Sequence, residues 1–191
     1  RRSLKVLKGF KILTTSNLMR YRKEVKFVNI VLLEPEIPQN TGNIGRTCVA
    51  TGTTLHLIKP LGFDIDEKAV KRCGLDYWQD LDLKVYENFE DFIQKNPNAH
   101  IYMATTKARK TYADVDYEKD CFIMFGKESA GIPEEILLKY KEDCVRIPML
   151  EEYRSLNLSN SVAIILYEAL RQNNFDHFLM KGDLHRHSWD E

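Results

Sequence analysis

The chain has 191 residues, a length that fits one domain with enough residues to bury a hydrophobic core. Hydrophobic residues make up 43% and charged residues 29%, as in ordinary globular proteins, and the formal net charge is zero. This balance argues against a protein that coats nucleic acid through bulk charge, but it leaves room for local basic patches. Two candidate patches are Lys68, Lys71 and Arg72, and Lys107, Arg109 and Lys110.

Residues 1–26 form a basic extension that we place outside the folded core. It contains no acidic residue before Glu24, and such a composition can mimic an organellar targeting peptide. We expect a translated leader or an added extension instead, with Met19 as an alternative start.

Apolar runs of strand length alternate with helix-like stretches along the rest of the chain. The expected strands are 27–33, 54–58, 85–86, 101–105, 121–125 and 144–147, and the expected helices are 44–51, 66–73 and 89–95. A last helix carries an apolar stripe from Val162 to Leu170 and ends at Asn173. This alternation predicts an α/β fold: a mainly parallel sheet with helices on both faces. The chain from Phe175 onward is polar and expected to be frayed, and residues 176–191 form a C-terminal tail outside the domain.

The cysteines and the apolar runs indicate where in the cell the protein would act. None of Cys48, Cys73, Cys121 and Cys144 belongs to a C-x-x-C pair, so we expect reduced thiols in the cytoplasm and no zinc site. No apolar run approaches the ~18–20 residues of a membrane span, and no membrane partner is expected. His185 and His187 are better explained as part of the tail than as metal ligands, and we expect no metal.

Three segments, 34–48, 125–134 and 146–161, are rich in Gly, Pro, Asn and Ser, and each follows or abuts an apolar run. In α/β proteins the loops after the strands commonly bind ligands. Each segment alone also fits an ordinary turn or helix cap. Together they indicate one composite site.

The first two segments lack the standard phosphate-binding patterns. In the first, Gly42 and Gly45 would let the backbone approach a ligand, while Asn40 and Arg46 have reach, but G-x-G-x-x-G is absent. The second lacks G-x-x-x-x-G-K-[ST], and Glu128 suits a sugar hydroxyl or a cation better than a phosphate.

The third segment is crowded with small hydrogen-bonding side chains in front of the last helix, more than one cap requires. They are Arg154, Ser155, Asn157, Ser159, Asn160 and Ser161.

At these residues the chain resembles the SPOUT RNA 2′-O-methyltransferases. The matching stretches are PEIPQNTGNI at 35–44 with Arg46, FGKESAGIP at 125–133 and RSLNLSNS at 154–161. Further matches at GLDY 74–77, TTK 105–107, RIPM 146–149 and YE 167–168 resemble the compact branch that methylates the ribose of the wobble nucleotide, position 34, of tRNA. Residues 1–26 are too few for a separate RNA-binding domain, which also favours that branch.

The resemblance implies properties that periodicity does not show. It implies a methyltransferase domain over residues 27–175 with a deep C-terminal trefoil knot, S-adenosylmethionine as cofactor, and a homodimer in which the partner chain completes each site. The cofactor would be held by Ala104, Thr105, Gly126, Ile147, Ser155 and Asn157. Catalytic positions would be Asn40, Arg46, Glu128, Ser155, Asn157 and Tyr167. We expect tRNA to be contacted by Lys107, Arg109, Lys110 and Arg154.

The implied reaction is 2′-O-methylation of cytidine or modified uridine 34 of tRNA. The protein must align oxygen, methyl carbon and sulfur and stabilise the charge that develops on the 2′-oxygen. Arg46 fits that stabilising role better than the role of general base, because guanidinium has a pKa above ~12. Two alternatives remain: a SPOUT methyltransferase for another RNA, and a homologue that binds RNA or cofactor without catalysis.

Overall fold

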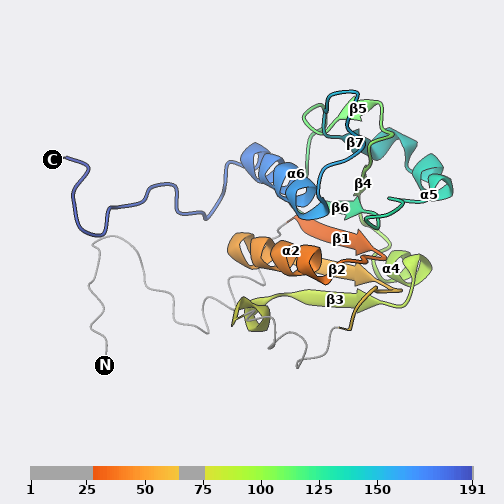
Figure 1. Ribbon diagram of the computed structural model, residues 1–191, viewed down its shortest axis with the longest axis horizontal. Helices are drawn as coiled ribbons and strands as arrows, with labels where there is room; N and C mark the ends of the chain where they lie inside the picture. The colour runs from red at the N-terminus through yellow and green to blue at the C-terminus, as the bar shows by residue number, and fades with distance from the viewer. Residues whose placement is uncertain (1–27, 65–75, 191) are drawn as a thin grey trace.

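The computed structural model describes residues 28–64 and 76–190. Its centre is a seven-stranded sheet in the order β3-β2-β1-β6-β4-β7-β5, in which every neighbouring pair is parallel (Figure 1). The strands are β1 (Asn29–Leu33), β2 (Thr54–Ile58), β3 (Leu83–Tyr86), β4 (Ile101–Ala104), β5 (Lys110–Thr111), β6 (Phe122–Phe125) and β7 (Cys144–Arg146). The predicted α/β class and parallel sheet are confirmed.

Helices cover both faces of this sheet. They are α2 (Pro38–Thr51), α4 (Phe89–Lys95), α5 (Glu134–Lys139) and α6 (Leu158–Gln172), with 3₁₀ turns η1 (Asp76–Asp80) and η2 (Lys141–Asp143). Alternation along each strand sends side chains to opposite faces. On β1, Ile30 and Leu32 join the core under α2 and α6, whereas Val31 and Leu33 join the core under α4 and α5.

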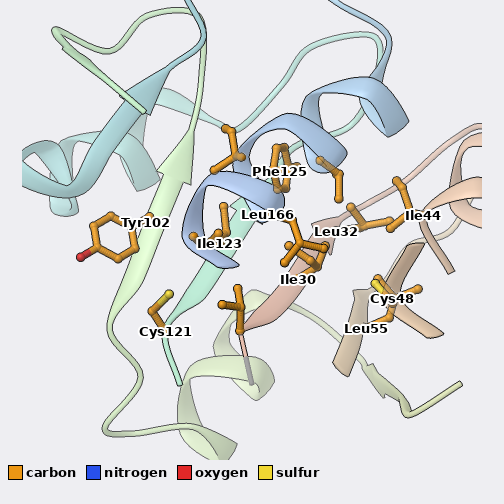
Figure 2. Packing of buried hydrophobic residues seen from close by; sticks show 14 of the residues in the cluster. Ile30, Leu32, Ile44, Cys48, Leu55, Tyr102, Cys121, Ile123, Phe125 and Leu166 are labelled. Carbon is orange, nitrogen blue, oxygen red and sulfur yellow. The ribbon is translucent and has the colours of Figure 1, made fainter. Parts of the chain in front are cut away.

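The helices α2 and α6 lie against each other on one face, although they stand at opposite ends of the fold in sequence (Figure 1). Figure 2 shows Leu166 of α6 among Ile30, Leu32 and Ile123, with Ile44 of α2 alongside. All five side chains are fully buried. This packing fixes the start of α6, and with it the third motif, relative to the first.

Most of the predicted elements are confirmed, some in detail. The helix Phe89–Lys95 has the predicted bounds, and the side chain of Asn88 caps it by accepting from the backbone N–H of Asp91. The last helix ends at the predicted Asn173. The helix expected at 66–73 and the Lys68–Arg72 patch lie outside the described residues. The short edge strand β5 has no counterpart among the predictions.

Two local predictions were wrong. The first motif is not an open loop up to Ile44, because α2 begins at Pro38. Gly45 therefore lies within a helix, where the ring of Trp78 comes within 3.2 Å of the position a Cβ would occupy. The tail is also not frayed at its start, since Phe175 and Phe178 are partly buried against the core.

Candidate functional site

A pocket of about 480 Å³ lies where the loops after β1, β4, β6 and β7 meet. These strands are parallel, so their carboxyl ends share one edge of the sheet, the usual place for a ligand. All six residues predicted to hold the cofactor line this one pocket: Ala104, Thr105, Gly126, Ile147, Ser155 and Asn157. Asn40 and Glu128, predicted to be catalytic, line it as well.

Three polar side chains, one from each motif, form a continuous hydrogen-bonded relay. Asn157 donates from Nδ2 to Oδ1 of Asn40 over 3.0 Å, and Asn40 donates from its own Nδ2 to Oε1 of Glu128 over 2.9 Å. Asn40 is only 5% exposed, so its amide depends on these two partners. Since Asn40 accepts from one neighbour and donates to the other, its amide orientation is defined.

Glu128 also holds the start of α2. Its carboxylate accepts the backbone N–H of Glu36 at 2.8 Å and that of Ile37 at 3.3 Å. Ile37 is the N-cap of α2 and provides no side-chain cap. A carboxylate at this end of a helix satisfies free N–H groups and favours the helix dipole. The second motif therefore stabilises the helix that carries Asn40.

Asn157 has two roles through its two amide atoms. Its Oδ1 caps α6 by accepting from the backbone N–H of Ser159 at 2.9 Å and of Asn160 at 3.4 Å. Its Nδ2 group donates to Oδ1 of Asn40. Part of the polar third motif thus serves the helix cap, whereas Ser155 and Ser161 line the pocket.

The loop after β6 is folded back tightly on itself. The N–H of Gly131 donates to the carbonyl of Lys127 over 2.8 Å, and Gly131 has a φ of +72°. A Cβ at Gly126 would lie 2.0 Å from the carbonyl carbon of Gly131, which no backbone tolerates. Glycine at 126 is therefore required for the loop to close beside the pocket.

Two predicted catalytic residues, Arg46 and Tyr167, are not among the described residues that line the pocket. Arg46 lies in the middle of α2, because this helix begins at Pro38 and not at Ile44, and its side chain is exposed. Tyr167 of α6 is 47% exposed. Both stand on the paired helices α2 and α6, outside the pocket of their own chain.

All four residues predicted to contact RNA are exposed. Lys107 lines the pocket and donates to Glu134 over 2.8 Å. Lys110 donates to the carbonyl of Glu142 over 2.7 Å. Arg109 and Arg154 are exposed but do not belong to the described lining of the pocket.

Two contacts at the pocket's edge were not anticipated. The carboxylate of Glu36 accepts both the backbone N–H and the hydroxyl of Ser129, at 2.9 and 2.8 Å. The hydrogen bonds from Ser129 lower the pKa of Glu36. The ammonium of Lys127 donates to Glu34 over 2.9 Å, which raises the pKa of Lys127. Each pair joins residues 93 positions apart, which no periodic pattern indicates. The two carboxylates of the sequence Glu-Pro-Glu at 34–36 were the only features of the sequence that pointed to these contacts.

The SpoU rRNA Methylase family model matches residues 27–167. The chain belongs to this family. The resemblance drawn from the three motifs is thereby confirmed.

Three individual proteins similar to this chain show which kinds of RNA methyltransferase it resembles. A Listeria monocytogenes protein, provisionally named as a tRNA (cytidine(34)-2′-O)-methyltransferase, is 51% identical over 161 residues, which is 83% of this chain and 95% of that protein. A structure described as giving insight into the 2-OH methylation of C/U34 on tRNA is 38% identical, with a TM-score of 0.73, and covers 78% of this chain and 98% of its own. An AdoMet-bound rRNA methyltransferase from Sinorhizobium meliloti is 26% identical, with a TM-score of 0.67 over 77% of this chain and 57% of its own.

Across residues 28–64 and 76–190, no helix is long and apolar enough to cross a membrane. The same described residues contain no cluster of three or more His, Cys, Asp or Glu suited to a metal ion.

Proposed function

We propose that this chain transfers the methyl group of S-adenosylmethionine to the ribose 2′-hydroxyl of nucleotide 34, a cytidine or modified uridine, in tRNA. The observation that carries the proposal is the convergence of three separate motifs on one pocket through the Asn157–Asn40–Glu128 relay. The names of the similar proteins support the choice of tRNA and of position 34.

The pocket suits S-adenosylmethionine in size and chemistry. Its volume of about 480 Å³ is within the usual range for a small-molecule site. Ile147 and Ile165 offer an apolar wall, while Thr105 and Ser155 offer polar groups. Gly126 lines the pocket, and a larger residue there would collide with the backbone of Gly131 and Ile132. The bound cofactor would supply an activated methyl group on a cationic sulfur.

The chain's own residues would orient the acceptor and stabilise charge. The relay holds Asn40 and Glu128 in fixed positions beside the pocket, where they suit a ribose hydroxyl. Arg46 would stabilise the negative charge on the 2′-oxygen, a role for which a preorganised donor is worth roughly 10²–10³ in rate. The basic residues Lys107, Arg109, Lys110 and Arg154 would contact tRNA phosphates.

A homodimer is part of the proposal because Arg46 and Tyr167 lie outside the pocket of their own chain. A second copy packed against α2 and α6 would bring its own Arg46 to this pocket. Exposed apolar side chains beside the site, Leu150 and Tyr153, favour such packing, since they are 70% and 68% exposed in the single chain.

Three finer features complete the proposal. We infer that the C-terminal part of the chain is threaded into a deep trefoil knot. The insertion of β7 between the earlier strands β4 and β5 supports this threading. We place the methyltransferase domain at residues 27–175, between the extension 1–26 and the tail 176–191. A tRNA substrate favours the cytoplasm as its place of action.

The test is methyl transfer to a synthetic anticodon stem-loop. We expect the purified protein to methylate a stem-loop with cytidine at position 34, and not the same stem-loop with 2′-deoxycytidine there. Methylation of the deoxy substrate would place the methyl group elsewhere. Cofactor binding without transfer to any tRNA would support the non-catalytic alternative, and transfer to ribosomal RNA alone would support another RNA substrate.

A further inference from the structure

Reciprocal hydrogen bonds join the connection between β1 and α2 to the loop after β6. Glu36 donates its backbone N–H to the carboxylate of Glu128, and its own carboxylate accepts the N–H and the hydroxyl of Ser129. Hydrogen bonds to a carboxylate are stronger than those between neutral groups. We call these contacts between Glu36 and residues 128–129 the clasp.

The backbone of Glu36 is supported from its other side by Gly62. The N–H of Gly62 donates to the carbonyl of Pro35 over 2.9 Å, and a Cβ at Gly62 would lie 2.6 Å from the carbonyl oxygen of Glu36. Glu36 thus stands between Gly62 and Ser129. The contact with Gly62 adds a support for this part of the backbone that does not come from the loop after β6.

The loop after β6 is closed on itself. Its ends are joined by the bond from Gly131 to Lys127 and by the close contact at Gly126. Residues 126–132 supply one wall of the pocket, whereas α2, which begins at Pro38, two residues after Glu36, brings Asn40 to the same pocket. The clasp therefore joins a wall of the proposed cofactor pocket to the helix whose Asn40 would face the ribose of the acceptor.

We propose that Glu36 is a positioning residue for methyl transfer, and this rests on the proposed function. Glu36 is not among the described residues that line the pocket, so it acts through Ser129 and Glu128. The length of the Glu36 side chain and its hydrogen bonds to Ser129 matter more for this role than its negative charge. A side chain of the same length that accepts from the Ser129 N–H keeps the alignment of donor and acceptor.

Three substitutions of Glu36, a control variant and a double variant test this proposal. Glu36→Ala removes the side-chain hydrogen bonds to Ser129, and Glu36→Asp keeps the charge but shortens the side chain by one methylene. Glu36→Gln keeps the length, with a carbonyl oxygen for the Ser129 N–H and an amide N–H for its hydroxyl oxygen. Glu87→Ala is the matched control. Glu87 is an exposed carboxylate that forms an ion pair with Lys59 over 2.9 Å, and neither residue lines the pocket.

The measurement is single-turnover methylation of the stem-loop at saturating cofactor and RNA, alongside calorimetric cofactor binding and thermal unfolding. We expect Glu36→Ala and Glu36→Asp to lose about tenfold or more in rate, because small misplacements of reacting groups are costly. Glu36→Gln should keep most of the rate, and Glu87→Ala should match the wild type. Ser129→Ala combined with Glu36→Ala should be no worse than Glu36→Ala alone.

The proposal is overturned if Glu36→Asp turns over as fast as the wild type, or if Glu36→Gln is as slow as Glu36→Ala. It is also overturned if the loss of rate in each variant is explained by the fraction unfolded at the assay temperature. A wild-type protein that methylates no stem-loop would instead contradict the proposed function, so the two failures are distinguishable.

Discussion

At the scale of single residues, the fold buries one histidine away from the pocket. His56 of β2 is fully buried, with Nδ1 2.9 Å from the Tyr86 hydroxyl and Nε2 3.1 Å from Oδ1 of Asn29. An amide oxygen only accepts, so Nε2 carries the proton and Nδ1 accepts from Tyr86. The ring is neutral, because burial, with a smaller contribution from Lys84, lowers the pKa of His56 to about 3.

This histidine makes stability depend on pH. In the unfolded chain the imidazole takes up a proton as the pH falls below 6.5, while the folded protein resists protonation down to about 3. The contribution to stability is present above pH 6.5 and is lost towards pH 3, by about 1.4 kcal/mol per pH unit. Urea unfolding of wild type and His56→Gln between pH 7 and 4 measures it. Equal slopes for the two proteins would contradict the assignment.

Residue types in the motifs were predictable, but their partners were not. Asn40, Glu128 and Asn157 were singled out from sequence, and the structure joins them in one relay. The clasp between Glu36 and Ser129 was missed because it links positions far apart in the chain, and only the fold brings them together.

At the scale of elements, helices with strong local signals were predictable and α2 was not. The stripe on α6 and the short helical stretch of α4 are local features, and both helices were predicted from them. The first turns of α2 contain Pro38, Gly42 and several small polar residues, which favour a loop. The carboxylate of Glu128 at the N-terminus, a tertiary contact, supports the helix there.

The two roles of Asn157 can be separated by substitution. Asn157→Ser keeps a side chain able to cap α6 but removes the amide donor to Asn40, whereas Asn157→Ala removes both. We expect both variants to lose about 1–3 kcal/mol of unfolding free energy, because the buried Asn40 oxygen loses its donor, and the alanine variant to lose about 1 kcal/mol more through the missing cap. Both should transfer methyl groups at least about tenfold more slowly. Denaturant titration and single-turnover rates test this, and a fully active serine variant would exclude the relay from the reaction.

At the scale of the whole molecule, the separation of Arg46 from the pocket has a direct test. We expect Arg46→Ala to bind cofactor normally and to lose about 10²–10³ in turnover. A second variant, Gly126→Val, should lose the cofactor pocket but keep Arg46. In a homodimer with shared sites, denaturing and refolding the two together should form hybrids that each contain one complete site.

Such hybrids should recover about a quarter of the wild-type activity, because half of the dimers are mixed and each mixed dimer has one working site of two. Refolded Arg46→Ala alone serves as the control. No recovery from a mixture shown by mass to contain hybrids would place Arg46 at the site of its own chain, and a monomer mass at micromolar concentration would exclude the dimer.

The alternation of strands and helices predicts a parallel sheet with a core on each face, but it does not predict the order of the strands in that sheet. The chemistry likewise depends on which loops the topology brings to one edge. Residue-level motifs become a site only when β1, β4, β6 and β7 end side by side.

The most direct test of methylation at position 34 is mass spectrometry of tRNA from cells with and without the gene. Fragments that contain the anticodon should lose one ribose methyl group at nucleotide 34 when the gene is deleted, and wild-type protein, but not Arg46→Ala, should restore it. Unchanged methylation of nucleotide 34 in every tRNA of the deletion strain, or loss of a methyl group at another position alone, would contradict the proposed function.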